Sequence, residues 1–202
     1  MNKIGLDLAY RTVGIAIINK EKLIYTSYDL SKERLPTPTL IYHMVDKVWE
    51  TIERYITTPH SLVIEDIFKG KWDNLKNIAR VQGGVISRYI QATGLCPELI
   101  LATDARKRVN IPIIAPKVAI QLWALDLFKI DTRRDIDPVY RKRIEESIKE
   151  YYKLYSSKNK SDKKRIKLLE KQFDTDTKRI HEITGLDNHS ADAMVLALCA
   201  NT

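Results

Sequence analysis

Three acidic side chains interrupt segments of the sequence that are otherwise apolar. Asp7 lies within "IGLDLA", Glu65 within "LVIEDIF", and Asp192 near the start of "ADAMVLALCA". A buried carboxylate is costly unless it is paired, hydrogen-bonded or bound to a cation. Convergence of the three on Mg²⁺, which prefers oxygen ligands, is the simplest explanation. Two such ions about 4 Å apart can activate a water and stabilise the leaving oxygen during phosphodiester hydrolysis.

His189 is the fourth group that could join this set. It precedes Asp192 by three residues, so both side chains lie on one face of a helix, whereas Asp187 lies about 140° away from Asp192. The imidazole could ligate metal, orient the attacking water or act as general base, and all three roles stay open. Each residue also has a structural alternative: His189 as one more polar residue of the first turn, and Asp7 as a turn-forming acid. Asp187 and Asn188 are interpreted as the N-cap of the last helix.

The elements that would position these side chains follow from the hydropathy pattern. β-Branched and apolar runs predict five strands, at residues 3–9, 13–19, 22–28, 61–68 and 98–103. Apolar residues at helical spacing predict helices over 40–56, 74–93 and 117–128, and another from about 188. Asp104 is a candidate N-cap for the chain that follows the fifth strand. This order predicts an α/β fold in which helices cover a mixed sheet. If the first and fourth strands are neighbours, Asp7 and Glu65 can face the same side.

The segment 129–184 does not belong to that pattern. From Lys129 to Glu182 it holds 17 Lys or Arg against 11 Asp or Glu, and so carries most of the chain's net charge of +8. Two apolar stripes at helical spacing, on either side of the polar "SSKNKSDKK", predict two helices. We expect a basic helical hairpin inserted before the last helix of a single domain, 1–202. The hairpin is either a solvated, charge-laced pair of helices or an arm that grips nucleic acid.

Composition limits the classes of protein that fit. The chain of 202 residues is 44% hydrophobic and 30% charged, as in soluble globular domains. No apolar run approaches the roughly 20 residues of a membrane span, and the first strand leaves no room for a signal peptide. Cys96 and Cys199 lack the spacing of a metal site or a disulfide framework. We therefore expect a cytoplasmic protein that does not bind membranes, with a polyanion, nucleic acid first, as partner.

Several stretches resemble RuvC-type Holliday junction resolvases of the ribonuclease H-like superfamily. "IGLDLAYRTVGIAI" resembles the family's first strand, acid, glycine-containing turn and second strand. "VIEDIFKGKWDNLKNIARVQGGVI" resembles its acid-bearing fourth strand and the helix that follows, and "HSADAMVLAL" resembles its C-terminal helix. The match spans 1–128 and 186–200. It implies a ribonuclease H-like mixed five-stranded sheet flanked by helices. "NIPIIAP" in place of a Gly-rich segment, and the insertion, indicate a phage, viral or otherwise divergent member.

The resemblance also implies site residues, cofactor and partners. Asp7, Glu65, His189 and Asp192 would be the catalytic and metal-binding residues, with two Mg²⁺ ions in each active site and Mn²⁺ able to substitute. The DNA-binding residues would be Phe68, Lys69, Lys107 and Lys117. The family acts as a homodimer that resolves four-way DNA junctions by paired symmetric nicks, leaving 5′-phosphate and 3′-hydroxyl ends.

Three other functions compete with this one. A flap, branched-DNA or RNA-directed nuclease would use the same chemistry on a different substrate. An ATP-binding relative of the actin and sugar-kinase superfamily needs a second phosphate-binding hairpin and an adenosine glycine motif, and the sequence has neither. A non-catalytic junction-binding protein would gain nothing from Asp7, Glu65 and Asp192, because their charge repels phosphate unless a cation intervenes.

Overall fold

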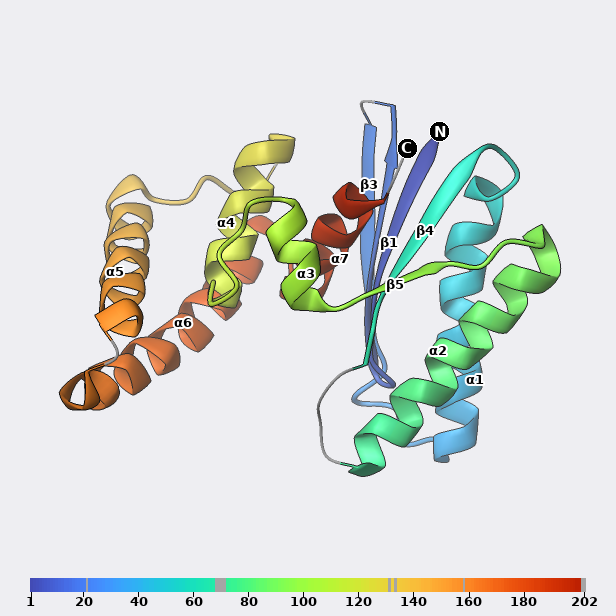
Figure 1. Cartoon of the computed structure of the whole chain (residues 1–202), viewed down its shortest axis with the longest axis horizontal. Helices are drawn as coiled ribbons and strands as arrows, with labels where there is room; N and C mark the ends of the chain where they lie inside the picture. Colours follow the sequence, from blue (N-terminus) through green and yellow to red (C-terminus); the bar gives the residue numbers. More distant parts are fainter. Residues whose placement is uncertain (21, 68–71, 131, 133, 158, 201–202) are drawn as a thin grey trace.

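A five-stranded mixed sheet runs through the middle of the computed structural model, which describes residues 1–20, 22–67, 72–130, 132, 134–157 and 159–200 (Figure 1). The strands are β1 (Asn2–Leu8), β2 (Thr12–Asn19), β3 (Lys22–Asp29), β4 (His60–Glu65) and β5 (Glu98–Ile100). Their order is β3-β2-β1-β4-β5. The first three strands form an antiparallel meander, and β4 and β5 add in parallel to β1. The predicted mixed sheet is thereby confirmed, with β1 and β4 as neighbours.

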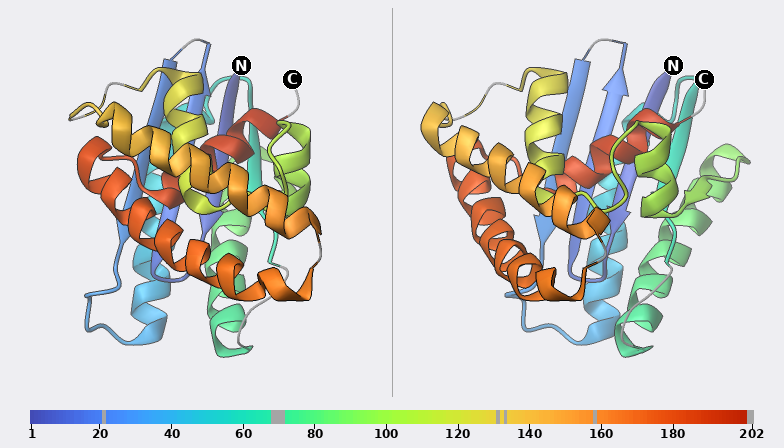
Figure 2. Two further views of the ribbon diagram at one scale, coloured as in Figure 1. Left: turned by 90° about the vertical axis from the view of Figure 1, so that its left-hand side faces the viewer. Right: turned by 60° about the vertical axis from the view of Figure 1, so that its left-hand side comes forward.

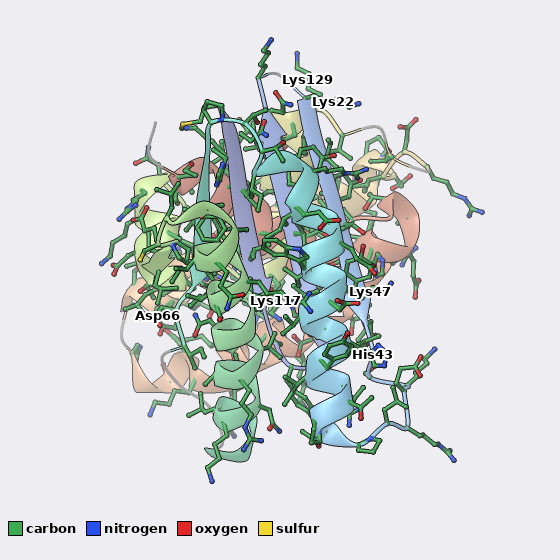
Figure 3. The ribbon with its side chains drawn as sticks, turned by 90° about the vertical axis from the view of Figure 1, so that its right-hand side faces the viewer. Lys22, His43, Lys47, Asp66, Lys117 and Lys129 are labelled. Atoms are coloured by element: carbon green, nitrogen blue, oxygen red, sulfur yellow. The ribbon has the colours of Figure 1, made fainter. Side chains whose placement is uncertain are left out.

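Helices cover both faces of the sheet. One face carries α1 (Thr37–Ile52), which is followed by the short η1 (Glu53–Tyr55), and α2 (Trp72–Thr93). Figure 3 shows α1 and α2 side by side, with His43 and Lys47 on the exposed side of α1. The other face carries α3 (Ala102–Arg108), α4 (Lys117–Phe128) and α7 (Asn188–Cys199), and α7 lies directly on β1 and β2. The two faces therefore bury separate hydrophobic cores.

Strand alternation sends Asp7 and Glu65 to the face covered by α7. In β1 the side chains of Ile4, Leu6 and Leu8 enter the core beneath α1 and α2, so Gly5 and Asp7 point the other way. In β4, Leu62 and Ile64 enter that same core, which turns Val63 and Glu65 toward α7. Both strands run toward the lower end of the molecule in Figure 1, where they end close to the start of α7.

Two glycines allow α7 to lie unusually close to the sheet. A β-carbon on Gly5 would collide with the backbone carbonyl oxygen of Ala193, and one on Gly14 with the backbone carbonyl of His189. Both contacts are with helix backbone, which cannot rotate away as a flexible side chain could. Gly5 and Gly14 therefore set the distance between the sheet and the first turns of α7.

The insertion forms the expected hairpin of α5 (Pro138–Ser157) and α6 (Lys163–Thr184), with the short η2 (Lys160–Asp162) between them. α6 packs on α4, and the wholly buried Gln121 of α4 joins them. Its Nε2 donates to the carbonyl oxygens of Thr177, at 3.3 Å, and Leu186, at 2.8 Å. Since Leu186 directly precedes the N-cap of α7, Gln121 ties the end of the hairpin to the start of that helix.

Two predicted features at β5 were wrong in detail. β5 ends at Ile100 instead of residue 103, because its partner β4 ends at Glu65, which is paired with Ile100. Asp104 is not an N-cap, because α3 already begins at Ala102 and Asp104 lies in its first turn. Among the described residues, none of the helices combines the length and the apolar character that a membrane span requires.

Candidate active site

The carboxyl ends of β1 and β4 and the first two turns of α7 bring the four predicted catalytic side chains together. Asp7 Oδ2 accepts a hydrogen bond from His189 Nδ1 at 2.6 Å, although the two residues are 182 positions apart in the chain. Glu65, on the neighbouring strand, lies within electrostatic reach of both Asp7 and Asp192. The side chains of Asp7 and Asp192 are 15% and 18% exposed, so these carboxylates are largely withdrawn from water.

The start of α7 is fixed by its N-cap, as predicted. Asp187 accepts hydrogen bonds at 2.9 Å from the backbone N–H and from the hydroxyl of Ser190. Burial would raise the pKa of Asp187, but hydrogen bonds from Ser27 and Ser190 outweigh it and hold the pKa below its usual value. Asp187 is thus a capping carboxylate, and it fixes the helix turn that presents His189 to Asp7.

Two of the carboxyl groups resist ionisation. Burial, followed by the negative charges of Asp7 and Asp192, raises the pKa of Glu65 to about 8. Burial and the charge of Asp7 likewise raise the pKa of Asp192 to about 6. The hydrogen bond to Asp7 raises the pKa of His189 as well. Each of these shifts has a neighbouring site residue among its causes. The ionised carboxylates therefore repel one another, and a positive charge between them would reduce this repulsion.

The raised pKa of Glu65 predicts a pH-dependent stability. Glu65 keeps its proton in the folded state up to about pH 8, whereas in the unfolded chain it loses the proton near its ordinary pKa of 4.5. The folded state therefore binds more protons between these values, and raising the pH favours unfolding. In EDTA the thermal midpoint should fall by several degrees from pH 5 to pH 8, because about 1 kcal/mol shifts it by about 2–4 °C. Glu65→Gln should reduce this fall; a variant that follows the parent's pH dependence would contradict the prediction.

Two cations lie near the carboxylates. Arg106 Nη2 is 3.6 Å from Asp192 Oδ1, and Arg106 Nη1 donates to the carbonyl oxygens of Ile113, at 3.1 Å, and Ala115, at 3.3 Å. The positive charge of Lys117, the first residue of α4, acts to lower the pKa values of Asp192 and His189. With the Asn188 amide oxygen turned toward its donors, Lys117 Nζ donates to it at 3.2 Å. Arg106 and Lys117 therefore place positive charge beside the carboxylates.

Arg106 is a functional candidate that sequence reasoning missed. The predicted residue was its neighbour Lys107, whose exposed side chain pairs with Asp104 at 2.9 Å. Asp104 and Lys107 are three residues apart, a spacing that favours an ion pair on the surface of a helix. This spacing could have favoured Arg106 over Lys107 in the sequence, because it gives Lys107 a local partner and places Arg106 on a different side of α3. Phe68 and Lys69 lie outside the described residues, and their DNA contacts stay predictions.

The side chains at this site suit a hard divalent cation in their chemistry. Asp7, Glu65 and Asp192 offer carboxylate oxygens, which Mg²⁺ and Mn²⁺ prefer. Burial and the charge of Asp7 raise the pKa of Glu65 and of Asp192, so a bound cation would favour their ionised forms. Within the described ranges, however, no three His, Cys, Asp or Glu side chains are arranged so that together they could hold a metal ion. The donors therefore fit the ion, but they do not form a ready-made ligand set.

Comparison with solved structures decides the fold. Thermus thermophilus RuvC in complex with a Holliday junction substrate matches with a TM-score of 0.52 and 14% identity, over 69% of this chain and 85% of that one. Another T. thermophilus RuvC structure matches with a TM-score of 0.51 and 15% identity, over 69% of this chain and 86% of that one. The chain has a RuvC-like fold. No protein-family model and no curated protein sequence matches it. The expected ribonuclease H-like, RuvC-type architecture is thus confirmed by structure.

Proposed function

We propose that the protein is a metal-dependent, structure-selective DNA endonuclease that resolves four-way junctions by paired symmetric nicks. The observation that carries the proposal is the meeting of Asp7, Glu65 and Asp192 at one end of the sheet, with His189 held by Asp7. A RuvC-like fold supports the choice of reaction. The structure of T. thermophilus RuvC with a Holliday junction substrate supports the choice of branched DNA. Action on such DNA would place the protein in the cytoplasm of a bacterium or of a host cell.

Asp7, Glu65 and Asp192 would hold the divalent cations, Mg²⁺ first, with two ions in each site and Mn²⁺ as a substitute. Such ions supply a lowered pKa for bound water and stabilise charge on the leaving oxygen. The residues' own contribution is to concentrate negative charge at a place where DNA phosphate alone would be repelled. Burial and mutual repulsion disfavour the negative charges of Glu65 and Asp192. Cation binding would therefore stabilise the ionised forms of these two side chains.

His189 would act as the general base. Asp7 accepts the hydrogen bond from Nδ1, which fixes the tautomer and leaves Nε2 as the basic ring nitrogen. The same hydrogen bond raises the pKa of His189 and so makes it a stronger proton acceptor. The proton of the attacking water would then pass to Nε2, while Arg106 and Lys117 would bind the phosphate whose bond is cut.

Replacing Arg106 separates this arrangement from one based on Lys107. Arg106→Gln is expected to slow junction cleavage by about 10- to 100-fold, the range found when groups that support a metal site are removed. Lys107→Gln is the matched control, because it removes an exposed side chain paired with Asp104, and it should change the rate less than twofold. Single-turnover cleavage of a labelled junction measures both. Equal losses in the two variants would contradict the assignment of Arg106 to the site.

A homodimer follows from the symmetry of the proposed substrate. A four-way junction has two-fold symmetry, so two symmetric nicks require two active sites related by the same symmetry. The protein contributes one carboxylate site per chain. We therefore propose that two copies act on one junction.

The substrate class is tested by a panel of labelled DNAs. Four-way junctions, three-way junctions, flaps and linear duplexes are incubated with the protein in Mg²⁺ or in EDTA. Preferential cutting of the four-way junction in Mg²⁺ is the expected result. Preferential cutting of flaps would change the proposed substrate from a four-way junction to a flap and would leave the proposed hydrolysis unchanged. Binding of junctions without cutting any of them would indicate a non-catalytic binding protein and overturn the proposal.

A further inference from the structure

Helix α6 of the inserted hairpin carries a stripe of lysines, which we call the α6 lysine stripe: Lys164, Lys167, Lys171 and Lys178. All four side chains are exposed, and none of them forms an ion pair with another described side chain. The spacings of three, four and seven residues place them within about 60° of one another at 100° per residue. The stripe is thus a row of four exposed lysines, about 21 Å long at 1.5 Å per residue.

The stripe lies opposite the face that α6 buries. The buried side chains of α6 centre on the positions of Leu169, Phe173 and Ile180, which pack against the rest of the helical layer. At 100° per residue the lysines lie about 160° from the middle of that face. The acidic residues Glu170 and Asp174 instead line a groove of 310 Å³ shared with Arg106 and Lys117. Asp174 follows Lys171 by three residues and precedes Lys178 by four, so it borders the stripe on the side of this groove.

α6 has a fixed position relative to the end of the sheet that holds the carboxylate site. In Figures 1 and 2, α5 lies on the upper side of α6, while β1 and β4 end at the lower side of the molecule. Gln121 and the packing of α6 on α4 hold this arrangement relative to α7. The stripe and the site are consequently held in one body.

We propose that the α6 lysine stripe binds the phosphate backbone of a duplex arm of the DNA whose branch point occupies the carboxylate site. This inference rests on the proposed function for the identity of the DNA. Lysines gain binding free energy by releasing the counterions of the phosphates they neutralise. A line of about 21 Å matches about six base pairs of duplex at 3.4 Å each. The hairpin thus adds contacts with an arm, beyond the branch point, and these contacts do not depend on base sequence.

The test compares two triple variants of the hairpin. One is Lys167→Gln, Lys171→Gln, Lys178→Gln, and the control is Lys142→Gln, Lys149→Gln, Lys153→Gln on α5, where the three lysines are also exposed. Both remove three charges from the same hairpin, and Gln is a good helix former. Circular dichroism and thermal unfolding check that both variants fold like the parent. Affinity for a labelled four-way junction is then measured in EDTA, where no cleavage occurs, over a range of salt concentrations.

The α6 variant should bind the junction at least about tenfold more weakly, and its slope of log K against log salt should be shallower by up to about 0.9 per lost contact. The α5 variant should bind within about twofold of the parent. Parental binding by the α6 variant, or equal losses in both variants, would overturn the inference. Because binding in EDTA is independent of cleavage, a parent that binds through the stripe but cuts nothing would sustain the inference and refute the proposed function instead.

Discussion

Asp192→Asn is expected to abolish junction cleavage while leaving the protein folded. Removing a group that only supports a metal ligand costs about 10- to 100-fold, so losing a ligand carboxylate should cost more than about a hundredfold. The asparagine keeps the shape of the side chain but cannot supply the negative charge that the proposed cations require. Single-turnover cleavage of a labelled four-way junction in Mg²⁺ measures the loss.

The same variant should be at least as stable as the parent above pH 6. The raised pKa of Asp192, about 6, means that ionising this carboxyl in the folded state is unfavourable. Asparagine removes that cost at pH 7, so urea unfolding should show no loss of stability. Asp104→Asn, which changes an exposed carboxylate of α3, is the control and should cut the junction at the parental rate. If Asp192→Asn also cuts at the parental rate, Asp192 is not part of a metal site.

Gly14→Ala is expected to cause a large loss of stability. The new β-carbon would collide with the backbone carbonyl of His189, so either β2 or the first turn of α7 must move. Overpacking of this kind costs about 1–3 kcal/mol, and more where the neighbour is backbone. Movement of α7 would also separate His189 from Asp7. Cleavage should therefore fall together with the free energy of unfolding, which urea denaturation measures.

Gly83→Ala is the matched control for that prediction. Gly83 lies in α2, is exposed, and a β-carbon there would meet no atom within 4 Å. Replacing glycine by alanine inside an exposed helix should stabilise the protein by about 0.5–1 kcal/mol. A Gly14→Ala variant as stable as the parent would show that α7 does not rest on β2 as closely as the structure indicates.

The positions of Asp7 and Glu65 could be predicted because they depend on strand alternation. Once β1 and β4 are neighbours, a period of two residues decides which side each carboxylate faces. The start of α7 was equally predictable, since Asp187 is a strong N-cap residue and its capping is local. Features that depend on residues close together in the sequence were therefore predicted correctly.

Features that depend on tertiary approach could not be predicted in the same way. β5 ends where its partner strand β4 ends, and no property of residues 101–103 predicts this end. Gly14 looks like any glycine in a strand until the backbone of α7 is placed against it. Arg106 reaches Asp192 only because α3 lies beside α7. The direction of the lysine stripe likewise depends on how α6 packs on α4 and α5.

The most direct test of the central claim is cleavage of a symmetric four-way junction labelled on two opposing strands. With Mg²⁺ the protein should nick both strands at symmetric positions and leave 5′-phosphate and 3′-hydroxyl ends. With EDTA in place of Mg²⁺ it should leave the junction intact. Cutting that persists in EDTA, or no cutting in either Mg²⁺ or Mn²⁺, would contradict a metal-dependent nuclease built on Asp7, Glu65 and Asp192.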